Sequence, residues 1–410
     1  MKSSLKTLGC ITAVLAAAAF AGAFSAQANE PIRIGYAADM SGACSPLVEG
    51  ATNAFRMGVD ELNKAGGLLG RKIEVIERDT KTKPDEGAKE ARDLIVNHKI
   101  DVLTGLCSSA VLLAENEVSK EFKVPFYSAI GATQAANIQK WQPYYWQTQP
   151  NALMEAVGVA EWVAKNKSVK RVSMFGFDYE YGHSAAAAFS ERLHKLRPDI
   201  TIQPLLTAKL GETNMTSYIT ALMAQNPDLV YSTLYGGGLT AFVRQGESYG
   251  FFKKSILLAN MTLDFLEPMG KTMPAGRVGG FSKGPFYAMM DNPKVRAFVS
   301  AYRARYKKYP SEWALLAYDG LMFYADAVKH AKSTAPDAVM KAVTSITYHG
   351  LRGTMTVRAL DGQMTAPAWV GLIGTDPKYP FMVLKNPERF DADKTIMTPE
   401  QILAGRAAAK

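Results

Sequence analysis

The chain has 410 residues, with 47 Lys and Arg against 38 Asp and Glu, which is a formal net charge of +9. The positive charge is spread along the chain without a long basic run or interleaved aromatics, so nucleic-acid binding is not expected. The length exceeds the ~250–300 residues that a single hydrophobic core usually reaches, which predicts two domains.

The first residues are typical of an export signal. Lys2 and Lys6 precede an apolar run over 8–24, and a cleavage-like Ala-Gln-Ala sequence follows it. At about 17 residues the run is shorter than the roughly 20 that cross a bilayer as a helix. We therefore predict a signal peptide over residues 1–28, cleaved after Ala28, and a periplasmic location. A retained membrane anchor is the alternative.

From residue 32 onward, short apolar runs alternate with segments of helical period, as in parallel βαβ units. The first such segment has its apolar face from Ala51 to Leu62, and Gly66 and Gly67 end it. The predicted strands of a first α/β unit are 32–39, 72–79, 101–106 and 124–130, with further helices over 86–98 and 110–122.

A second α/β unit is expected after the aromatic, turn-prone stretch 141–146. Its first helix covers 152–165, and its predicted strands are 170–178, 201–206, 229–234, 255–260 and 277–281. Beyond it, helices over 292–306 and 313–330 are expected to pack on the first unit. The strand-like runs 354–358 and 368–373 are expected to join the second unit.

This order predicts an α/β fold of two doubly wound parallel-sheet lobes, joined by a hinge of several chain crossings. The first lobe is expected to comprise 29–148 plus about 286–350, and the second 149–285 plus about 351–400. Residues 401–410 form a predicted C-terminal tail.

Three local patterns lie in order along the first unit. They are Ile34-Gly35 with Met40-Ser41-Gly42, the run from Asn63 to Ile73, and Gly105 to Ser109 with Gly131-Ala132-Thr133 a strand later. In these patterns the chain resembles the branched-chain amino-acid-binding (Leu/Ile/Val-binding) family of type I periplasmic binding proteins, the substrate-binding components of ABC importers. The resemblance covers nearly all of the chain beyond the signal peptide. It implies two lobes that close on a small-molecule solute, and a membrane permease as partner.

The first lobe is expected to hold the carboxylate of a ligand. Ser108 and Ser109 lie between a strand and the following helix, where backbone N–H groups and hydroxyls can form an anion cradle. The resemblance assigns the carboxylate to Ser108 and matches Ala132 and Thr133 with a second contacting loop. An ordinary serine N-cap and a turn hydroxyl are the alternative interpretations.

The second lobe is expected to supply aromatic side chains and an amide. The resemblance matches Tyr181 with a tyrosine that closes the cleft and Tyr235 with an aromatic that lines it. Where amino-acid receptors of the family hold the ligand's amine with carboxylates, this chain has Asn151 and Asn260. A buried ammonium without a carboxylate is costly, so we expect a carboxylate-bearing solute, an aromatic or other organic acid, or an amide. A branched-chain amino-acid receptor and a sensory ligand-binding subunit are the alternatives.

Two cysteines remain after removal of the signal peptide, Cys44 after the first strand and Cys107 after the third. In a 2-1-3 strand order these strand ends are neighbours, so a disulfide is sterically compatible. The family's usual bridge uses another partner, in the loop where this chain has Thr80-Lys81-Thr82. Two free thiols are the alternative.

Enzyme motifs are incomplete. The run from Gly182 to Ala186 imitates a nucleophile elbow but ends in alanine, and the five histidines show no paired metal-ligand spacing. We therefore expect a monomeric binding protein with no enzymatic activity, no cofactor and no metal.

Overall fold

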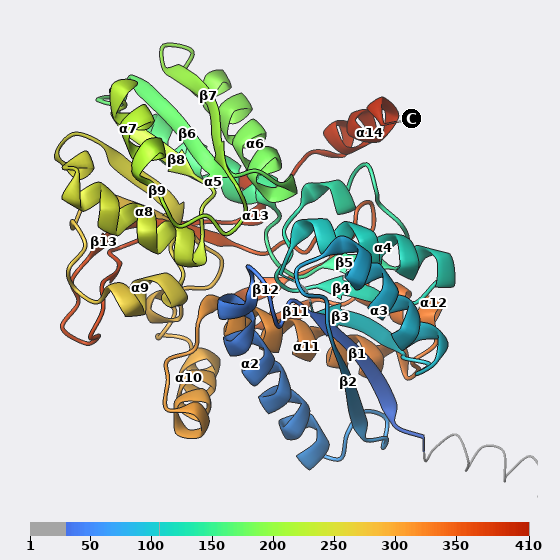
Figure 1. Cartoon of the computed structure of the whole chain (residues 1–410). Helices are drawn as coiled ribbons and strands as arrows, with labels where there is room; N and C mark the ends of the chain where they lie inside the picture. The colour runs from blue at the N-terminus through green and yellow to red at the C-terminus, as the bar shows by residue number, and fades with distance from the viewer. Residues whose placement is uncertain (1–29, 106, 410) are drawn as a thin grey trace, which may run out of the picture.

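The computed structural model describes residues 30–105 and 107–409 (Figure 1). The predicted signal peptide, 1–28, lies outside the described residues. Within the described ranges, no helix combines the length and the apolar character needed to cross a membrane.

The first lobe contains a parallel sheet with the strand order β2-β1-β3-β4-β5. Its strands are β1 (Ile32–Ala38), β2 (Ile73–Asp79), β3 (Val102–Gly105), β4 (Phe126–Ser128) and β5 (Tyr145–Gln147). The helices around it are α2 (Ser45–Lys64), α3 (Pro84–Val96), α4 (Ser109–Phe122), α10 (Pro293–Tyr306), α11 (Glu312–Ala331) and α12 (Pro336–Val343), with a 3-10 turn over Gln134–Ala136. The predicted strands and helices of this unit are confirmed to within a few residues.

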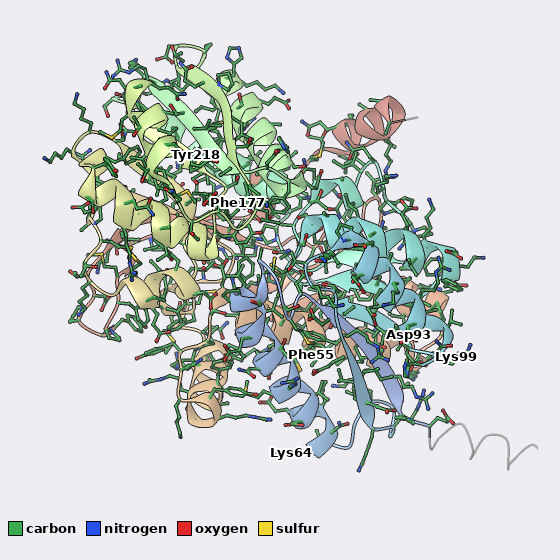
Figure 2. The ribbon with its side chains drawn as sticks, in the orientation of Figure 1. Phe55, Lys64, Asp93, Lys99, Phe177 and Tyr218 are labelled. Carbon is green, nitrogen blue, oxygen red and sulfur yellow. The ribbon has the colours of Figure 1, made fainter. Side chains whose placement is uncertain are left out.

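The two faces of this sheet belong to different clusters of buried side chains, because successive residues of a strand point to opposite sides. Ile34 and Tyr36 of β1 lie in the core with α2 and α11, while Ala37 lies in the core with α3 and α4. Tyr36 stacks on Phe55 of α2, with ring centroids 4.5 Å apart; Figure 2 labels Phe55 on this helix. Helices therefore cover both faces, as a parallel sheet requires.

The prediction of a turn-prone link over 141–146 is wrong at its end. Residues 145–147 form β5, which pairs with β4 in register. Tyr145 lies 5.4 Å from Phe126 and Trp146 lies 5.2 Å from Tyr127, measured between ring centroids. Aromatic contacts on successive residues, which point to opposite faces, stabilise a strand in a position that the flanking turn residues obscure in the sequence.

The second lobe contains a sheet with the order β14-β13-β10-β9-β8-β6-β7, in which β13 and β14 run antiparallel. Its strands are β6 (Arg171–Phe177), β7 (Thr201–Ala208), β8 (Leu229–Ser232), β9 (Ile256–Asn260), β10 (Val278–Ser282), β13 (Ala368–Gly374), β14 (Val383–Leu384) and β15 (Glu388–Phe390), which pairs with β13. Its helices are α5 (Ala152–Lys165), α6 (Glu180–Leu196), α7 (Thr216–Ala224), α8 (Gly236–Ser248), α9 (Leu263–Met269) and α13 (Ala392–Thr395), with 3-10 turns over Phe251–Lys253 and Phe286–Ala288. The last helix, α14 (Pro399–Ala408), follows them near the C-terminus. Figure 1 shows the two lobes side by side, with α14 at the end of the chain above the first lobe; Arg406 of α14 donates to the carbonyl of Asn137 of the first lobe at 3.1 Å.

The late part of the chain returns to both lobes. Helices α10 and α11 pack on the first lobe as predicted: Tyr306 donates to the carbonyl of Asn53 at 2.7 Å and Tyr318 to Glu61 at 2.6 Å. Strand β13 joins the second sheet beside β10, also as predicted.

The expected strand over 354–358 does not join the second sheet. Residues 353–355 form β12, which pairs with β11 (Tyr348–Gly350) in a separate hairpin. This hairpin forms because only two residues separate the end of β11 from the start of β12. In addition, the buried side chains of Tyr348 and Met355 face each other across the two strands.

The chain crosses between lobes after β5, after β10 and between β12 and β13. Two crossings are hydrogen-bonded to each other: the Gln147 amide donates to Gly362 at 2.8 Å, and the Met364 amide donates to Gln147 at 2.9 Å. These crossings form the hinge that the sequence predicts.

Candidate ligand-binding site

A small cavity of about 30 Å³ lies between the two lobes, beyond the carboxyl ends of strands of both sheets. Its wall is formed by Leu47, Cys107, Ser109, Ile130, Ala132, Tyr179, Tyr181, Tyr235, Asn260, Lys283 and Trp313. The cavity thus brings together Ser109, Ala132, Tyr181, Tyr235 and Asn260 of the predicted ligand residues. The other two, Ser108 and Thr133, do not line the cavity but are adjacent in the sequence to residues that do.

Ser108 is the N-cap of α4. Its hydroxyl accepts from the Val111 amide at 3.5 Å, and its own amide donates to Asp39 at 2.6 Å. The Cys107 amide donates to the same carboxylate oxygen at 2.7 Å, so Asp39 holds the start of the helix in place. The N-cap interpretation is therefore confirmed, and the contact of Ser108 with a ligand stays a prediction.

The helix start can nevertheless receive an anion. Ser109 is the first residue of α4 and lies in the cavity wall. Amides of a first turn have no partner within the helix, and the helix dipole favours negative charge there. The Ser109 hydroxyl accepts from the Ala132 amide at 3.4 Å, which joins the two predicted carboxylate-binding segments.

Thr133 connects the two lobes. Its hydroxyl donates to Glu180 of α6 at 2.6 Å and accepts from the Ala135 amide at 3.1 Å. The turn interpretation is thus confirmed, whereas the contact with Glu180 is not predicted by any local pattern. Because the bond lies beside the cavity and joins opposite lobes, it belongs to a closed arrangement.

Aromatic side chains of the second lobe form the opposite wall. The Tyr235 ring lies 5.4 Å from that of Phe177 and 6.3 Å from that of Tyr179; Figure 2 labels Phe177 where the second lobe faces the first. The Tyr181 hydroxyl donates to Glu155 at 2.9 Å, and the Tyr235 hydroxyl lies 4.0 Å from the sulfur of Cys44. This wall offers flat apolar surface with hydroxyls at its edges.

The two asparagines that suggested a site without carboxylates have different positions. Asn260, at the end of β9, lines the cavity, and its Oδ1 is buried without a hydrogen-bond partner. Asn151 is instead the N-cap of α5: it accepts from the Met154 amide at 3.0 Å and donates to Gln363 at 3.0 Å in the hinge. Asn151 does not line the cavity, because the helix start and the hinge satisfy its amide, and its expected place beside the ligand stays a prediction.

A cation that was not predicted from the sequence also lines the cavity. Lys283 follows β10 and is, among the described residues, the single charged side chain of the wall. Its Nζ lies 2.6 Å from Glu155 Oε1, donates to Gln149 at 2.7 Å, and stands 5.1 Å from the Trp313 ring centroid. The sequence did place this lysine directly after a predicted strand, where the ligands of open α/β sheets bind, so its position could have indicated a ligand contact.

Glu312, the first residue of α11, completes this cluster. One carboxylate oxygen accepts from the Ser282 hydroxyl and from the Lys283 amide, while Oε1 is buried without a partner. Burial raises the pKa of Glu312 to about 8, although Ser282 and Lys283 act against that shift. The site therefore holds a carboxyl group that is mostly neutral at pH 7.

The thiols of Cys44 and Cys107 are free in this structure. Together with Asp39 they form a group whose donor atoms lie within 4.8 Å of one another. Both oxygens of Asp39 already accept hydrogen bonds, from Thr80 and from the amides of Cys107 and Ser108. The carboxylate therefore positions the strand ends, and the group is better suited to packing than to holding a metal ion.

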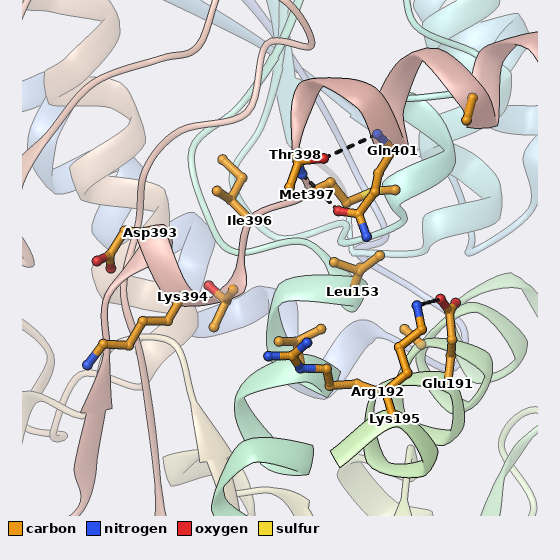
Figure 3. A pocket seen from close by; sticks show the side chains of 14 residues that line it. Leu153, Glu191, Arg192, Lys195, Asp393, Lys394, Ile396, Met397, Thr398 and Gln401 are labelled. Carbon is orange, nitrogen blue, oxygen red and sulfur yellow. Dashed lines mark hydrogen bonds and ion pairs between the residues drawn. The ribbon is translucent and has the colours of Figure 1, made fainter.

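A larger groove lies between α5, α6 and the C-terminal segment (Figure 3). Its charged side chains lie at the surface, as in the pair of Glu191 and Lys195, 2.6 Å apart. Thr398 and Gln401 form the capping box of α14 and thus satisfy each other. None of the predicted ligand residues lines this groove, whereas the smaller cavity combines a helix start, aromatic rings and a buried cation.

Two sheets with a hinge of several crossings and a cavity between the lobes define a bilobed solute-binding protein. Residues 31–376 match the family described as periplasmic binding protein. The chain belongs to this family, which confirms the resemblance and the predicted fold class and implies a periplasmic location.

Several proteins and solved structures are similar to this chain over most of its length. "Leu/Ile/Val-binding protein homolog 8" of Brucella suis is 24% identical over 349 residues, 82% of this chain and 85% of its own. A solute-binding protein of an ABC transporter from Rhodopseudomonas palustris, solved with 3,4-dihydroxybenzoic acid, has a TM-score of 0.79 at 20% identity, covering 89% of this chain and 98% of its own. A leucine-binding protein from Thermotoga maritima has a TM-score of 0.76 at 19% identity, covering 87% and 98%.

Proposed function

We propose that this protein captures a small carboxylate-bearing solute, with an aromatic acid as the leading candidate, and delivers it to the permease of an ABC importer. The observation that carries the proposal is the charge of the cavity wall. Among the described residues the wall has one cation, Lys283, and no carboxylate. Lys283 presents an ammonium to a ligand carboxylate, although Glu155 behind the wall balances its charge; the ammonium of an amino acid would meet a like charge at this point of the wall.

The remaining wall suits the rest of such a ligand. The start of α4 at Ser109 supports a carboxylate through the positive end of the helix dipole and the Ser109 hydroxyl in the cavity wall. The rings of Tyr179, Tyr235 and Trp313 support a flat apolar body. Asn260 Oδ1 and the indole N–H of Trp313, both buried without partners, suit a polar substituent.

Leucine or a related amino acid is the second candidate. The Brucella and Thermotoga relatives carry names of that kind, and Glu155 lies directly behind Lys283, where a rearranged side chain could meet an ammonium.

Calorimetric titration with 3,4-dihydroxybenzoate, benzoate and leucine separates the candidates. We expect at least one aromatic acid to bind more tightly than leucine, with saturation and one site per chain. Lys283→Met should weaken acid binding by about ten- to a hundredfold, since hydrogen bonds to charged groups contribute about 1.5–3 kcal/mol.

Two controls accompany this measurement. Lys165→Met removes an exposed lysine paired with Glu388 and should leave binding unchanged. Lys283→Met combined with Glu155→Gln avoids a buried unpaired carboxylate, so that loss of binding is separated from loss of folding. Tighter binding of leucine than of any acid would contradict the proposal.

A further inference from the structure

The buried cluster behind the cavity has a charge balance that a bound anion must disturb. The side chains of Lys283 and Glu155 are 2% and 0% exposed, and their charged atoms are 2.6 Å apart. An ammonium has three protons to donate, and the Gln149 side chain accepts one of them at 2.7 Å, while Oε1 of Glu155 lies at ion-pair distance without a hydrogen bond. Lys283 lines the cavity together with Trp313, so a ligand in the cavity lies beside this pair.

The groups that face this pair are neutral, so Lys283 is the cation of the cluster and Glu155 is its anion. Glu312 of α11 has its pKa raised to about 8 by burial and is mostly neutral at pH 7. Tyr181 of α6 donates to Glu155, and burial raises the pKa of Tyr181, Tyr179 and Tyr231 well above the usual value, so these phenols are neutral too. The cluster is therefore balanced before a ligand enters.

A ligand carboxylate beside Lys283 places two anions against one cation in a region with almost no solvent. Uncompensated buried charge is strongly unfavourable, and a carboxylate in this position is relieved most readily by protonation. Burial raises the pKa of Glu155, while Lys283 and the Tyr181 hydroxyl lower it. When Lys283 also interacts with a ligand carboxylate, it lowers the pKa of Glu155 less, and Glu155 is protonated more easily.

We propose that ligand capture is coupled to the uptake of one proton by Glu155, which releases Lys283 to the carboxylate of the ligand. This inference rests on the proposed function. The proton comes from the solvent and bonds to Oε1 of Glu155, while the Tyr181 hydroxyl keeps its bond to Oε2 at 2.9 Å. The ammonium stays protonated and exchanges one carboxylate partner for another.

Titration calorimetry in phosphate and in Tris, which differ in ionisation enthalpy, measures the proton directly. With 3,4-dihydroxybenzoate or benzoate we expect uptake of about one proton per ligand near pH 7. The Kd should then rise by up to about tenfold per pH unit between about pH 6 and 8. Binding without uptake, or with proton release, overturns the inference and leaves the proposed function intact.

Two isosteric variants identify the group that takes the proton. Glu155→Gln should abolish both the uptake and the pH dependence of Kd. Glu312→Gln imitates a group that is already neutral and should keep both. Loss of uptake in Glu312→Gln with retention in Glu155→Gln overturns the assignment. If none of the acids binds wild-type protein, the proposed function fails and the coupling fails with it.

Discussion

Single buried carboxyl groups carry much of the chemistry of this protein at the residue scale. Glu155 and Glu312 are both buried on the lobe boundary, but only Glu155 has a cation at ion-pair distance. Glu312 has a hydroxyl and an amide as donors, and these do not offset its burial. Two residues of the same type therefore differ in charge because their neighbours differ.

The raised pKa of Glu312 predicts a pH-dependent stability. The folded protein holds this proton up to about pH 8, whereas an unfolded glutamate releases it near its usual pKa of about 4.3. Its contribution to the free energy of unfolding is therefore fully present below that usual pKa. It is lost as pH rises toward about 8, at up to about 1.4 kcal/mol per pH unit.

Urea unfolding at several pH values measures this loss. The stability of Glu312→Gln relative to wild type should increase with pH across that window, because glutamine has no proton to lose. Glu49→Gln, at an exposed side chain, is the control and should show a constant difference from wild type. A constant difference for Glu312→Gln as well would contradict the assignment.

Helix starts decide the geometry at the element scale. The starts of α4 and α5 both have a side-chain cap, Ser108 and Asn151, yet only the first points toward the ligand cavity. Asn151 uses its amide donor on Gln363, which joins the first crossing of the hinge to the third. The cap of α5 is therefore a hinge residue.

Asn151→Ala should lower the free energy of unfolding by about 1–2 kcal/mol, through loss of the cap and of the bond to Gln363. Asn151→Ser keeps an oxygen for the Met154 amide and should lose less. Chemical denaturation measures both variants, and titration with aromatic acid and leucine should show unchanged selectivity. A switch of selectivity toward leucine would show instead that Asn151 meets the ligand.

At the scale of the whole molecule, contacts across the cleft join the two lobes. Thr133 donates to Glu180, and the Cys44 sulfur lies 4.0 Å from the Tyr235 hydroxyl. The hinge crossings are held together by other hydrogen bonds, such as the one from the Gln147 amide to the Gly362 carbonyl. Closure can therefore change without loss of the hinge, which is the behaviour expected of a hinge-bending receptor.

Thr133→Val tests this separation, because it removes the hydroxyl at nearly constant volume. We expect the ligand-bound radius of gyration to rise toward the ligand-free value in solution scattering, and the affinity to fall by about tenfold. Thr133→Ser keeps the hydroxyl and should behave like wild type. Equal compaction of the valine variant would show that the bond to Glu180 does not hold the lobes.

The sequence by itself determined the alternation of strands and helices and the order of the two units. Periodicity and turn residues act over a few positions, so strands such as β1 and β6 could be predicted to within two residues. The motif around Ser108 also located the cavity edge, because a strand end followed by a helix start is a local pattern. Strand β5 and the hairpin of β12 were not predicted, because these strands form only through pairing with other strands, β4 and β11.

Only the tertiary structure decided which side chains meet. Lys283, Glu155 and Glu312 come from the end of β10, from α5 and from α11, and no spacing along the chain predicts that they touch. Asn151 and Asn260 look equivalent in the sequence. In the structure, however, Asn151 donates to Gln363 in the hinge, whereas Asn260 lines the cavity. Local propensity sets the elements, whereas charge balance at the ligand site depends on distances between elements that the crossings of the hinge bring together.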